Sequence, residues 1–224
     1  MNHKYSLLAL LVLLLLVLAG CTALTGLGGD VTAETTESQG VDVPGVPSLT
    51  VNHFGGEIHV TNGESGRVEA DLTKRSRVDD KAEAEAQLEQ IVMSFTQSGT
   101  DVTLNVEGPD NLGELASAPS AALELRVPPG TTLDVDLGAG EVTVDQPAGD
   151  VALNVGAGNA TVILPADAAF HLIIAGGVAD IISDFEGVPD GGLATDVEVV
   201  IGDNPTQTLT FNLGAGEVHL EQAP

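Results

Sequence analysis

The sequence has few of the residues on which many functional sites depend. Its 224 residues include one cysteine, no tryptophan and one tyrosine, and only seven lysines and arginines stand against 33 aspartates and glutamates. A single cysteine excludes an intrachain disulfide, a CxxC redox pair and a zinc site built from several thiolates. The formal net charge of −26 makes nucleic acid and anionic lipid surfaces poor partners, because both would be repelled.

Aromatic rings are equally scarce. The one tyrosine, Tyr5, lies in the N-terminal leader, and the chain has five phenylalanines, of which Phe170 and Phe211 fall at positions expected to face a core. This composition argues against a carbohydrate site built on stacked aromatic rings.

The N-terminus has the pattern of an export signal. Lys4 lies in a short polar start, and Leu7 to Ala19 form an apolar run of 13 residues, which is too short to cross about 30 Å of hydrocarbon as an ordinary helix. The run ends in Leu18-Ala19-Gly20-Cys21, which resembles the lipobox of bacterial lipoproteins. The resemblance implies cleavage before Cys21, acylation of Cys21 by chains such as palmitate, and an extracytoplasmic protein anchored to the cell membrane. An ordinary signal peptide with a chance cysteine and an uncleaved anchor are the alternatives.

These features predict three segments. Residues 1–20 form the lipoprotein signal peptide, and residues 21–47 form a flexible, lipid-anchored tether, because Gly, Thr, Ser and Glu dominate there without an apolar period. Residues 48–224 are expected to form a single folded domain.

A glycine-centred phrase repeats within that domain. Leu-Gly-Ala-Gly-Glu-Val occurs at 137–142 and 213–218, with relatives at 155–160 and 174–179 and an early version, Phe-Gly-Gly-Glu-Ile, at 54–58. Repetition at a fixed period is the signature of a repeat architecture. Three of the corners follow one another at intervals of 18 and 19 residues, measured between Gly140, Gly158 and Gly177.

Alternation on both sides of each corner predicts strands. Aliphatic residues occupy every second position, so one face of each strand is apolar. Each unit therefore consists of a strand, a three-residue corner and a second strand. This pattern predicts an all-β fold, a β-solenoid of 18–19-residue coils with aliphatic residues stacked inside. In the alternative, each Gly-Ala-Gly is a hairpin loop of an antiparallel sandwich or barrel.

Stacking one coil on the next also places polar residues in columns. Asp136 would lie beside Asn154, and Glu141 beside Asn159, so that like charges are not opposed. The last unit, Leu209 to Leu220, ends four residues before the C-terminus. We therefore expect it to be the exposed end of the solenoid.

The region before the regular repeats contains other elements. We expect a first strand–corner–strand unit at 49–60, a strand at 67–78, a short surface helix near 79–90 with Ala84, Leu88 and Ile91 at helical spacing, a hairpin formed by 91–96 and 101–107, and a strand at 121–127.

Three short segments resemble the bacterial putative-adhesin and toast-rack group of domains. They are Gly55-Gly56-Glu57-Ile58, the segment 125–135 (Leu-Arg-Val-Pro-Pro-Gly-Thr-Thr-Leu-Asp-Val), and Gly138-Ala139-Gly140. The resemblance covers most of the chain after the leader. It implies a β-helical, extracytoplasmic domain without an established catalytic activity.

Basic residues are concentrated in one stretch. Four of the six that follow the leader are Lys74, Arg75, Arg77 and Lys81. They are interpreted either as a solvated edge that forms salt bridges with neighbouring acids or as a contact for an anionic polymer.

Two Glu-x-His pairs are candidate metal ligands. Glu57 with His59, and Glu217 with His219, each place a carboxylate and an imidazole on one strand face, a set that suits zinc, manganese or nickel. Polar alternation alone also produces such pairs. No cofactor is expected, although scattered carboxylates could bind calcium weakly.

The sequence lacks the usual catalytic motifs. It has no Gly-x-Ser-x-Gly, no phosphate-binding glycine loop and no HExxH, and Arg126 is the only Lys or Arg after residue 81. We therefore expect a non-catalytic, lipid-anchored, adhesin-like or envelope-structure protein whose partner is a protein or an envelope polymer. The alternative is a metal- or anionic-polymer-binding module, with a vestigial β-helical polysaccharide lyase as its extreme form.

Overall fold

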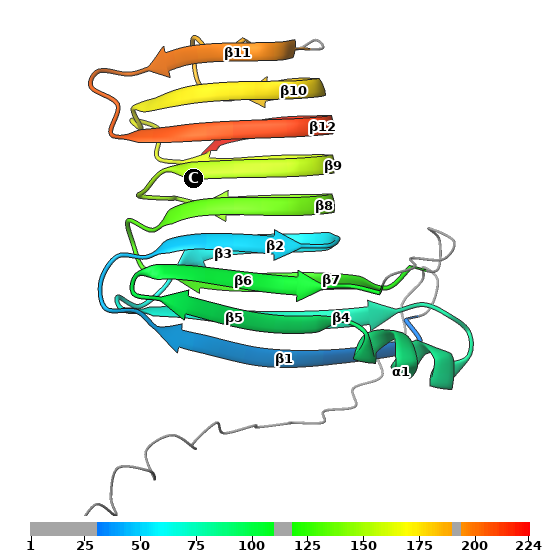
Figure 1. Ribbon diagram of the computed structural model, residues 1–224. Coiled ribbons are helices and arrows are strands. Elements are labelled where there is room, and N and C mark those ends of the chain that lie inside the picture. Colours follow the sequence, from blue (N-terminus) through cyan, green and yellow to red (C-terminus); the bar gives the residue numbers. More distant parts are fainter. Residues whose placement is uncertain (1–30, 110–117, 190–193) are drawn as a thin grey trace, which may run out of the picture.

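The structure is a computed structural model that describes residues 31–109, 118–189 and 194–224. Its strands join one mixed sheet that does not close on itself, and one short helix lies at an end (Figure 1). The strands are β1 (Ala33–Asp42), β2 (Ser48–His53), β3 (Gly56–Asn62), β4 (Arg67–Ser76), β5 (Val92–Ser98), β6 (Asp101–Glu107), β7 (Ser120–Val127), β8 (Thr132–Asp145), β9 (Val151–Leu164), β10 (Phe170–Ser183), β11 (Ala194–Ile201) and β12 (Gln207–Gln222), and the helix is α1 (Lys81–Glu89). The mostly β fold with one helix is as predicted.

Four long strands carry the regular repeats. β8, β9, β12 and β10 lie parallel to one another in that order, and each contains one glycine corner. Leu137 pairs with Val155 before the corner, and Val142 pairs with Ala160 after it. Because each Gly-Ala-Gly lies within a strand and its flanks pair with other strands, the hairpin-loop interpretation is wrong.

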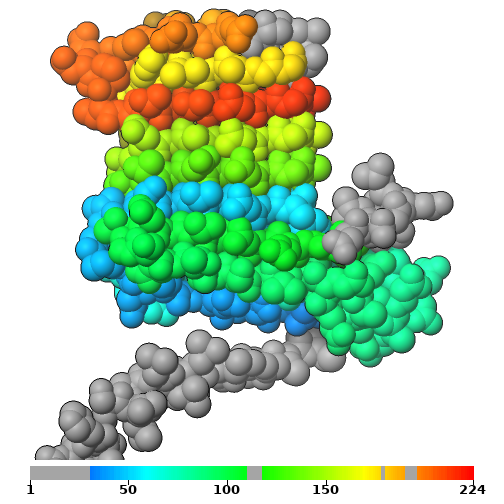
Figure 2. All heavy atoms as spheres, viewed as in Figure 1, coloured from blue at the N-terminus to red at the C-terminus, as the bar shows by residue number. Residues whose placement is uncertain are grey.

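The order of these strands differs from the order of the sequence. β12, at the C-terminal end of the chain, lies between β9 and β10, with Leu213 paired to Val155 on one side and to Gly176 on the other (Figures 1 and 2). The expectation that 209–220 forms an exposed end is therefore wrong. The physical reason is that β11 folds back antiparallel onto β10, which leaves the other edge of β10 for the returning chain.

The first half of the domain continues the same stack. β2 pairs in parallel with the first half of β8, and β3 with its second half, so the predicted unit at 49–60 is confirmed. β6 and then β5 follow β2, whereas β7, β4 and β1 follow β3. The predicted hairpin is formed by β5 and β6, and the strand predicted at 121–127 is β7.

Alternation fills the interior with aliphatic side chains. Val155 is 2% exposed and Val162 is fully buried, as the inward positions of the repeat predict. Each contributes to a row that crosses several strands, such as the row formed by Leu137, Val155 and Leu213. Burial of this apolar surface is the main stabilising contribution to the fold.

Part of the predicted tether is folded. Within 21–47, residues Ala33–Asp42 form β1, which pairs antiparallel with β4 along its full length. The expectation of a flexible segment is wrong for this part. Its polar side chains gave no apolar period because most of them are exposed, and the strand is held by backbone pairing.

The helix is as predicted. α1 begins after Asp80, whose side chain accepts a hydrogen bond of 2.9 Å from the backbone N–H of Glu83, as an N-cap should. Ala84 and Leu88 are its buried residues. Among the residues that the structure describes, no helix has the length and apolar character needed to cross a membrane.

Candidate binding groove

The glycine corners bring neighbouring strands unusually close together. Gly140 and Gly158 have φ of +138°, a conformation that side-chain-bearing residues rarely adopt. Gly156 has an ordinary φ, but a Cβ on it would lie 2.4 Å from the carbonyl oxygen of Gly138. The backbone therefore requires both glycines of the repeated phrase, whereas the alanine between them is exposed at Ala157.

Next to the corners, five neighbouring strands place an asparagine or aspartate at the same register. The alternation of side chains puts all five on the outer face, about 4.8 Å apart from one strand to the next. We call this row the amide ladder, and its members in spatial order are Asn105, Asn52, Asp136, Asn154 and Asn212.

Hydrogen bonds connect parts of the amide ladder. Asn52 Nδ2 donates to Asn105 Oδ1 at 2.7 Å, and Asn212 Nδ2 donates to Asn154 Oδ1 at 2.7 Å. Asn154 Nδ2 donates in turn to Asp134 Oδ1 at 3.0 Å. Asp136, in the middle, has no side-chain hydrogen bond or ion pair with any residue in the described ranges. Its carboxylate is free to accept from a ligand.

The amide ladder lines an open groove of about 840 Å³. Phe54 and Glu107 stand at one end of it, and Gly138 and Gly156 contribute where the strands bend. The half-buried ring of Phe54 occupies the register position that glycine takes in the next strands, since His53 pairs with Leu137. The groove therefore combines amides, carboxylates and one phenyl ring.

His53 lies beneath this end of the groove. It is 3% exposed, and its ring stacks on that of Phe54, with centroids 5.5 Å apart. The backbone N–H of Gly55 donates to its Nδ1 at 3.1 Å, while Nε2 has no partner within the described part of the chain. Burial lowers the pKa of His53 to about 4, so the ring is neutral at physiological pH.

The two Glu-x-His pairs are not brought together. His59 Nδ1 lies 3.0 Å from Glu124 Oε2 on β7, and His219 Nε2 lies 3.0 Å from Glu217 Oε2. β8 and β9 separate β3 from β12. In the described ranges no three His, Cys, Asp or Glu residues gather as metal ligands would.

The four clustered basic residues do not share one surface. Lys74 faces inward and is 7% exposed, and its Nζ lies 2.6 Å from the carbonyl oxygen of Ile91 and 3.2 Å from Glu37 Oε2. Arg75 pairs with Glu34 at 2.8 Å, and Lys81 pairs with Glu85 at 3.5 Å. Three of the four thus form salt bridges with neighbouring acids, which was one of the two interpretations of this stretch. Arg77 forms no ion pair with a described residue. The predicted lipidation site, Cys21, lies outside the described ranges.

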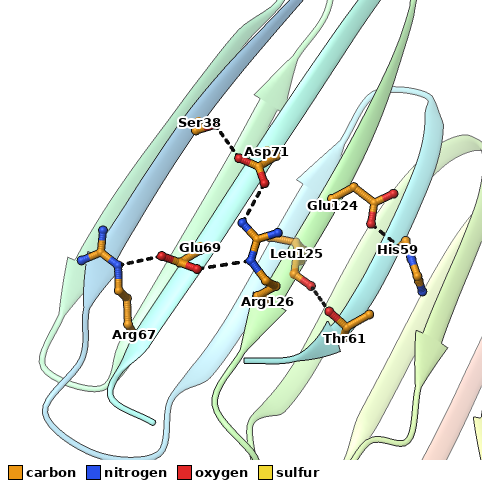
Figure 3. A network of polar contacts seen from close by, with 9 residues as sticks. All are labelled: Ser38, His59, Thr61, Arg67, Glu69, Asp71, Glu124, Leu125 and Arg126. Atoms are coloured by element: carbon orange, nitrogen blue, oxygen red, sulfur yellow. Dashed lines mark hydrogen bonds and ion pairs between the residues drawn. The ribbon is translucent and has the colours of Figure 1, made fainter. Parts of the chain in front are cut away.

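A polar network on the outer face joins β1, β4 and β7 (Figure 3). Arg126 contacts Glu69 through Nε at 3.2 Å and Asp71 through Nη2 at 2.7 Å. Arg67 also binds Glu69, at 3.1 Å, and Ser38 Oγ donates to Asp71. These contacts were not predicted, because they depend on the pairing of β4 with β7 and β1.

The network changes the acidity of its members. Hydrogen bonds from Arg126 and Arg67 lower the pKa of Glu69. Burial alone would raise the pKa of Asp71, but hydrogen bonds from Ser38 and Arg126 outweigh it and lower the pKa. Both carboxylates are consequently held in the charged form, and Arg126 is occupied by them.

Sequence reasoning found only part of the groove. It placed Asp136 beside Asn154, which the structure confirms. It missed Asn52, Asn105 and Asn212, because these residues join the ladder through pairings between distant segments. The signal available was an Asn or Asp two residues before the corner in four of the five glycine units, the unit on β10 being the exception.

Comparison with known proteins gives similarity of fold. No protein-family model and no curated protein sequence matches the chain. Among solved structures, a putative cell adhesion protein from Clostridium sporogenes ATCC 15579 has a TM-score of 0.53 and 15% sequence identity, covering 85% of this chain and 100% of that one. A putative adhesin from Bacteroides fragilis NCTC 9343 has a TM-score of 0.23 and 11% identity, covering 84% of this chain and 98% of that one. The described chain therefore shares its fold with the clostridial protein, in agreement with the resemblance found in the sequence.

Proposed function

We propose that the chain is a non-catalytic lipoprotein, anchored through Cys21 to the outside of the bacterial cell membrane, that makes adhesin-like contacts with a partner. The observation that carries this proposal is the lipobox tetrad 18–21, directly after a 13-residue apolar run, on a chain that folds like a putative cell adhesion protein. The parallel rungs, in this proposal, serve as a rigid β-solenoid that holds a binding surface away from the membrane.

A non-catalytic role is supported by the positions of the basic residues. A lyase-like site needs a free base beside its carboxylates, but Arg126 is bound by Glu69 and Asp71. Lys74 is buried against Ile91. His53 is buried below the groove surface with a lowered pKa, which suits a structural position better than general acid–base chemistry at an exposed site.

Anchoring is tested by replacing Cys21. We expect the full chain, expressed in a bacterial host, to stay with the membrane after an alkaline wash and to have a mature N-terminus at Cys21 carrying acyl chains by mass spectrometry. The Cys21→Ser variant should retain its leader and lack the acyl mass, while the neighbouring Thr22→Ser variant should behave as wild type. A wild-type chain whose mature N-terminus lies at another residue would reject the anchor.

Display and contact are tested on intact cells. External protease should degrade the wild-type chain after the outer envelope is made permeable, and beads coated with the full chain should be retained by isolated envelope material. Protection from the protease in such cells would place the protein inside the cytoplasmic membrane and reject the proposal.

A further inference from the structure

We propose that the groove along the amide ladder binds an extended, uncharged polysaccharide. The inference rests on the proposed function, because it names the ligand class that the displayed protein would contact. It is carried by the register of five polar side chains, the free carboxylate in their middle and the charge of the surrounding surface.

The hydrogen-bonding groups of the groove suit a polyhydroxylated ligand. Each sugar hydroxyl both donates and accepts, so it can bind an amide and a carboxylate equally well. Asp136 has no partner among the described residues and can only accept, whereas the amides of Asn52 and Asn154 offer donors and acceptors. Phe54 supplies an apolar surface at one end, which the C–H faces of sugar rings can cover.

The dimensions favour a chain over a single sugar. The amide ladder crosses five neighbouring strands, which spans about 19 Å at a strand spacing of about 4.8 Å. One such group lies on each of the five strands, at the same register. A regular polymer that presents hydroxyls along its length can therefore contact several rungs at once.

Charge selects against anionic polymers. Glu107 and Asp136 line the groove, and no lysine or arginine is among the described residues that line it. His53 also lines it but is neutral at physiological pH. A uronic-acid polymer would be repelled by these carboxylates and by the acidic chain as a whole.

A peptide strand fits less well. The rungs of the groove formed by β2, β8 and β9 already pair with a strand on each side, so their backbone offers no edge for an added strand. The groove also runs across the strands, from one rung to the next. Side-chain hydrogen bonding is thus the main interaction available.

The experiment compares two asparagines of β9. Asn154 belongs to the amide ladder, whereas Asn159 lies beyond the corner on the same strand, is also half-buried and does not line the groove. The purified full chain in detergent is titrated with neutral linear oligosaccharides of increasing length, with matched uronic-acid oligosaccharides and with extended peptides, by calorimetry.

We expect the neutral oligosaccharides to bind, with affinity rising until the length of the ladder is covered. Asn154→Ala should weaken binding about tenfold, as the loss of one or two hydrogen bonds does, and Asn159→Ala should not change it. Asn154 bonds to both Asp134 and Asn212, whereas Asn212 bonds only to Asn154, so Asn212→Ala at the end of the ladder is the second variant with the smaller internal loss. Unfolding midpoints of all variants are measured beside the affinities.

Three outcomes would overturn the inference. They are stronger binding of the uronic-acid oligosaccharides or peptides, equal effects of Asn154→Ala and Asn159→Ala in folded protein, and the absence of neutral-glycan binding. Failure of the proposed function would be seen in different experiments, because anchoring is tested by the acylation of Cys21 and display is tested by digestion with external protease. If the chain is anchored and displayed but binds no neutral glycan, only the inference that the groove binds a polysaccharide is rejected.

Discussion

Gly140 on β8 and Gly158 on β9 lie directly opposite each other, and the carbonyl oxygen of Gly140 is 1.8 Å from the position that a Cβ on Gly158 would occupy. The same contact recurs between Gly158 and Gly216 on β12, at 1.6 Å. The glycine corner is thus a packing requirement between strands as much as a bend within each strand.

Replacement of Gly158 should therefore be costly. Gly158→Ala would combine an unfavourable φ with a clash against backbone that cannot rotate away, and we expect the free energy of unfolding to fall by about 3 kcal/mol or more. Ala157→Ser, one residue earlier at an exposed position, is the control and should change it by less than about 0.5 kcal/mol. Urea denaturation measures both. A Gly158→Ala variant as stable as the control would show that the strands can move apart.

His53 should make the protein sensitive to mild acid. Its folded pKa of about 4 lies below its usual value of 6.5, so the unfolded chain binds a proton first as the pH falls. Stability is therefore fully present above about pH 6.5 and is lost toward pH 4, by about 2 kcal/mol between pH 6.5 and 5. His53→Leu, which matches Leu137 in the next strand, should remove most of this loss.

The measurement is urea denaturation at pH 7 and pH 5. His219→Gln, which removes another, partly exposed imidazole, is measured as the control. Glu69 and Asp71 contribute little to the difference between pH 7 and pH 5. Because their pKa values are lowered, their stabilising effect is lost only when the pH falls below the ordinary pKa of a carboxylic acid. If the free energy of unfolding of wild type and of His53→Leu depended equally on pH, protonation of His53 would not be the cause of the acid sensitivity.

Arg126 should contribute modestly to the attachment of β7 to β4. Its side chain is 43% exposed, so solvent screens its ion pairs, and we expect Arg126→Gln to lower the free energy of unfolding by about 1 kcal/mol at low salt. High salt should reduce the difference between variant and wild type. Arg77→Gln is the control, since Arg77 has no ion pair with a described residue. A larger loss at high salt than at low salt would exclude an electrostatic cause.

The Arg126→Gln variant should also respond less to strong acid. In the wild type, the lowered pKa values of Glu69 and Asp71 give a contribution that is present above their ordinary values and lost as the pH falls below about 4. Without the guanidinium, both pKa values should rise toward normal. Carboxylate titration by NMR would detect the change, and unchanged values would show that Ser38 and Arg67 suffice.

Local patterns in the sequence predicted most elements but could not order them. Alternation and the glycine phrase predicted the strands, their inward faces and the pairing of Asp136 with Asn154. The position of β12 could not be predicted, because all four long strands present similar edges and the repeat fits several stacking orders. The repeat spacing also did not indicate that β3 would pair with β8, which places Glu57 opposite Glu141 in a like-charge contact.

β1 and the groove were missed for a different reason. β1 is an edge strand with mostly exposed side chains, so it carries no apolar alternation and resembles a linker in composition. The amide ladder joins residues up to 160 positions apart in the sequence, from Asn52 to Asn212. Only the register between strands reveals that they form one row.

Deletion of residues 207–224 should separate one end of the stack from the rest. β10 pairs with β12 and β11, and among the described residues it has no pairing to β9. We expect the shortened chain to lose amide hydrogen-exchange protection at Leu172 and Ile174, while Leu104 on β6 stays protected. Protection of Leu172 at the wild-type level would mean that β9 and β10 can pair directly.

The place of β12 also governs when the protein can finish folding. Ribosomes and export channels deliver a chain from its N-terminus, so β9 and β10 emerge before the strand that must lie between them. Until β12 arrives, each presents an unpaired parallel edge, which is a template for pairing with other chains. A product that stops before β12 is therefore left with two unpaired parallel edges, one on β9 and one on β10, which other chains can pair with.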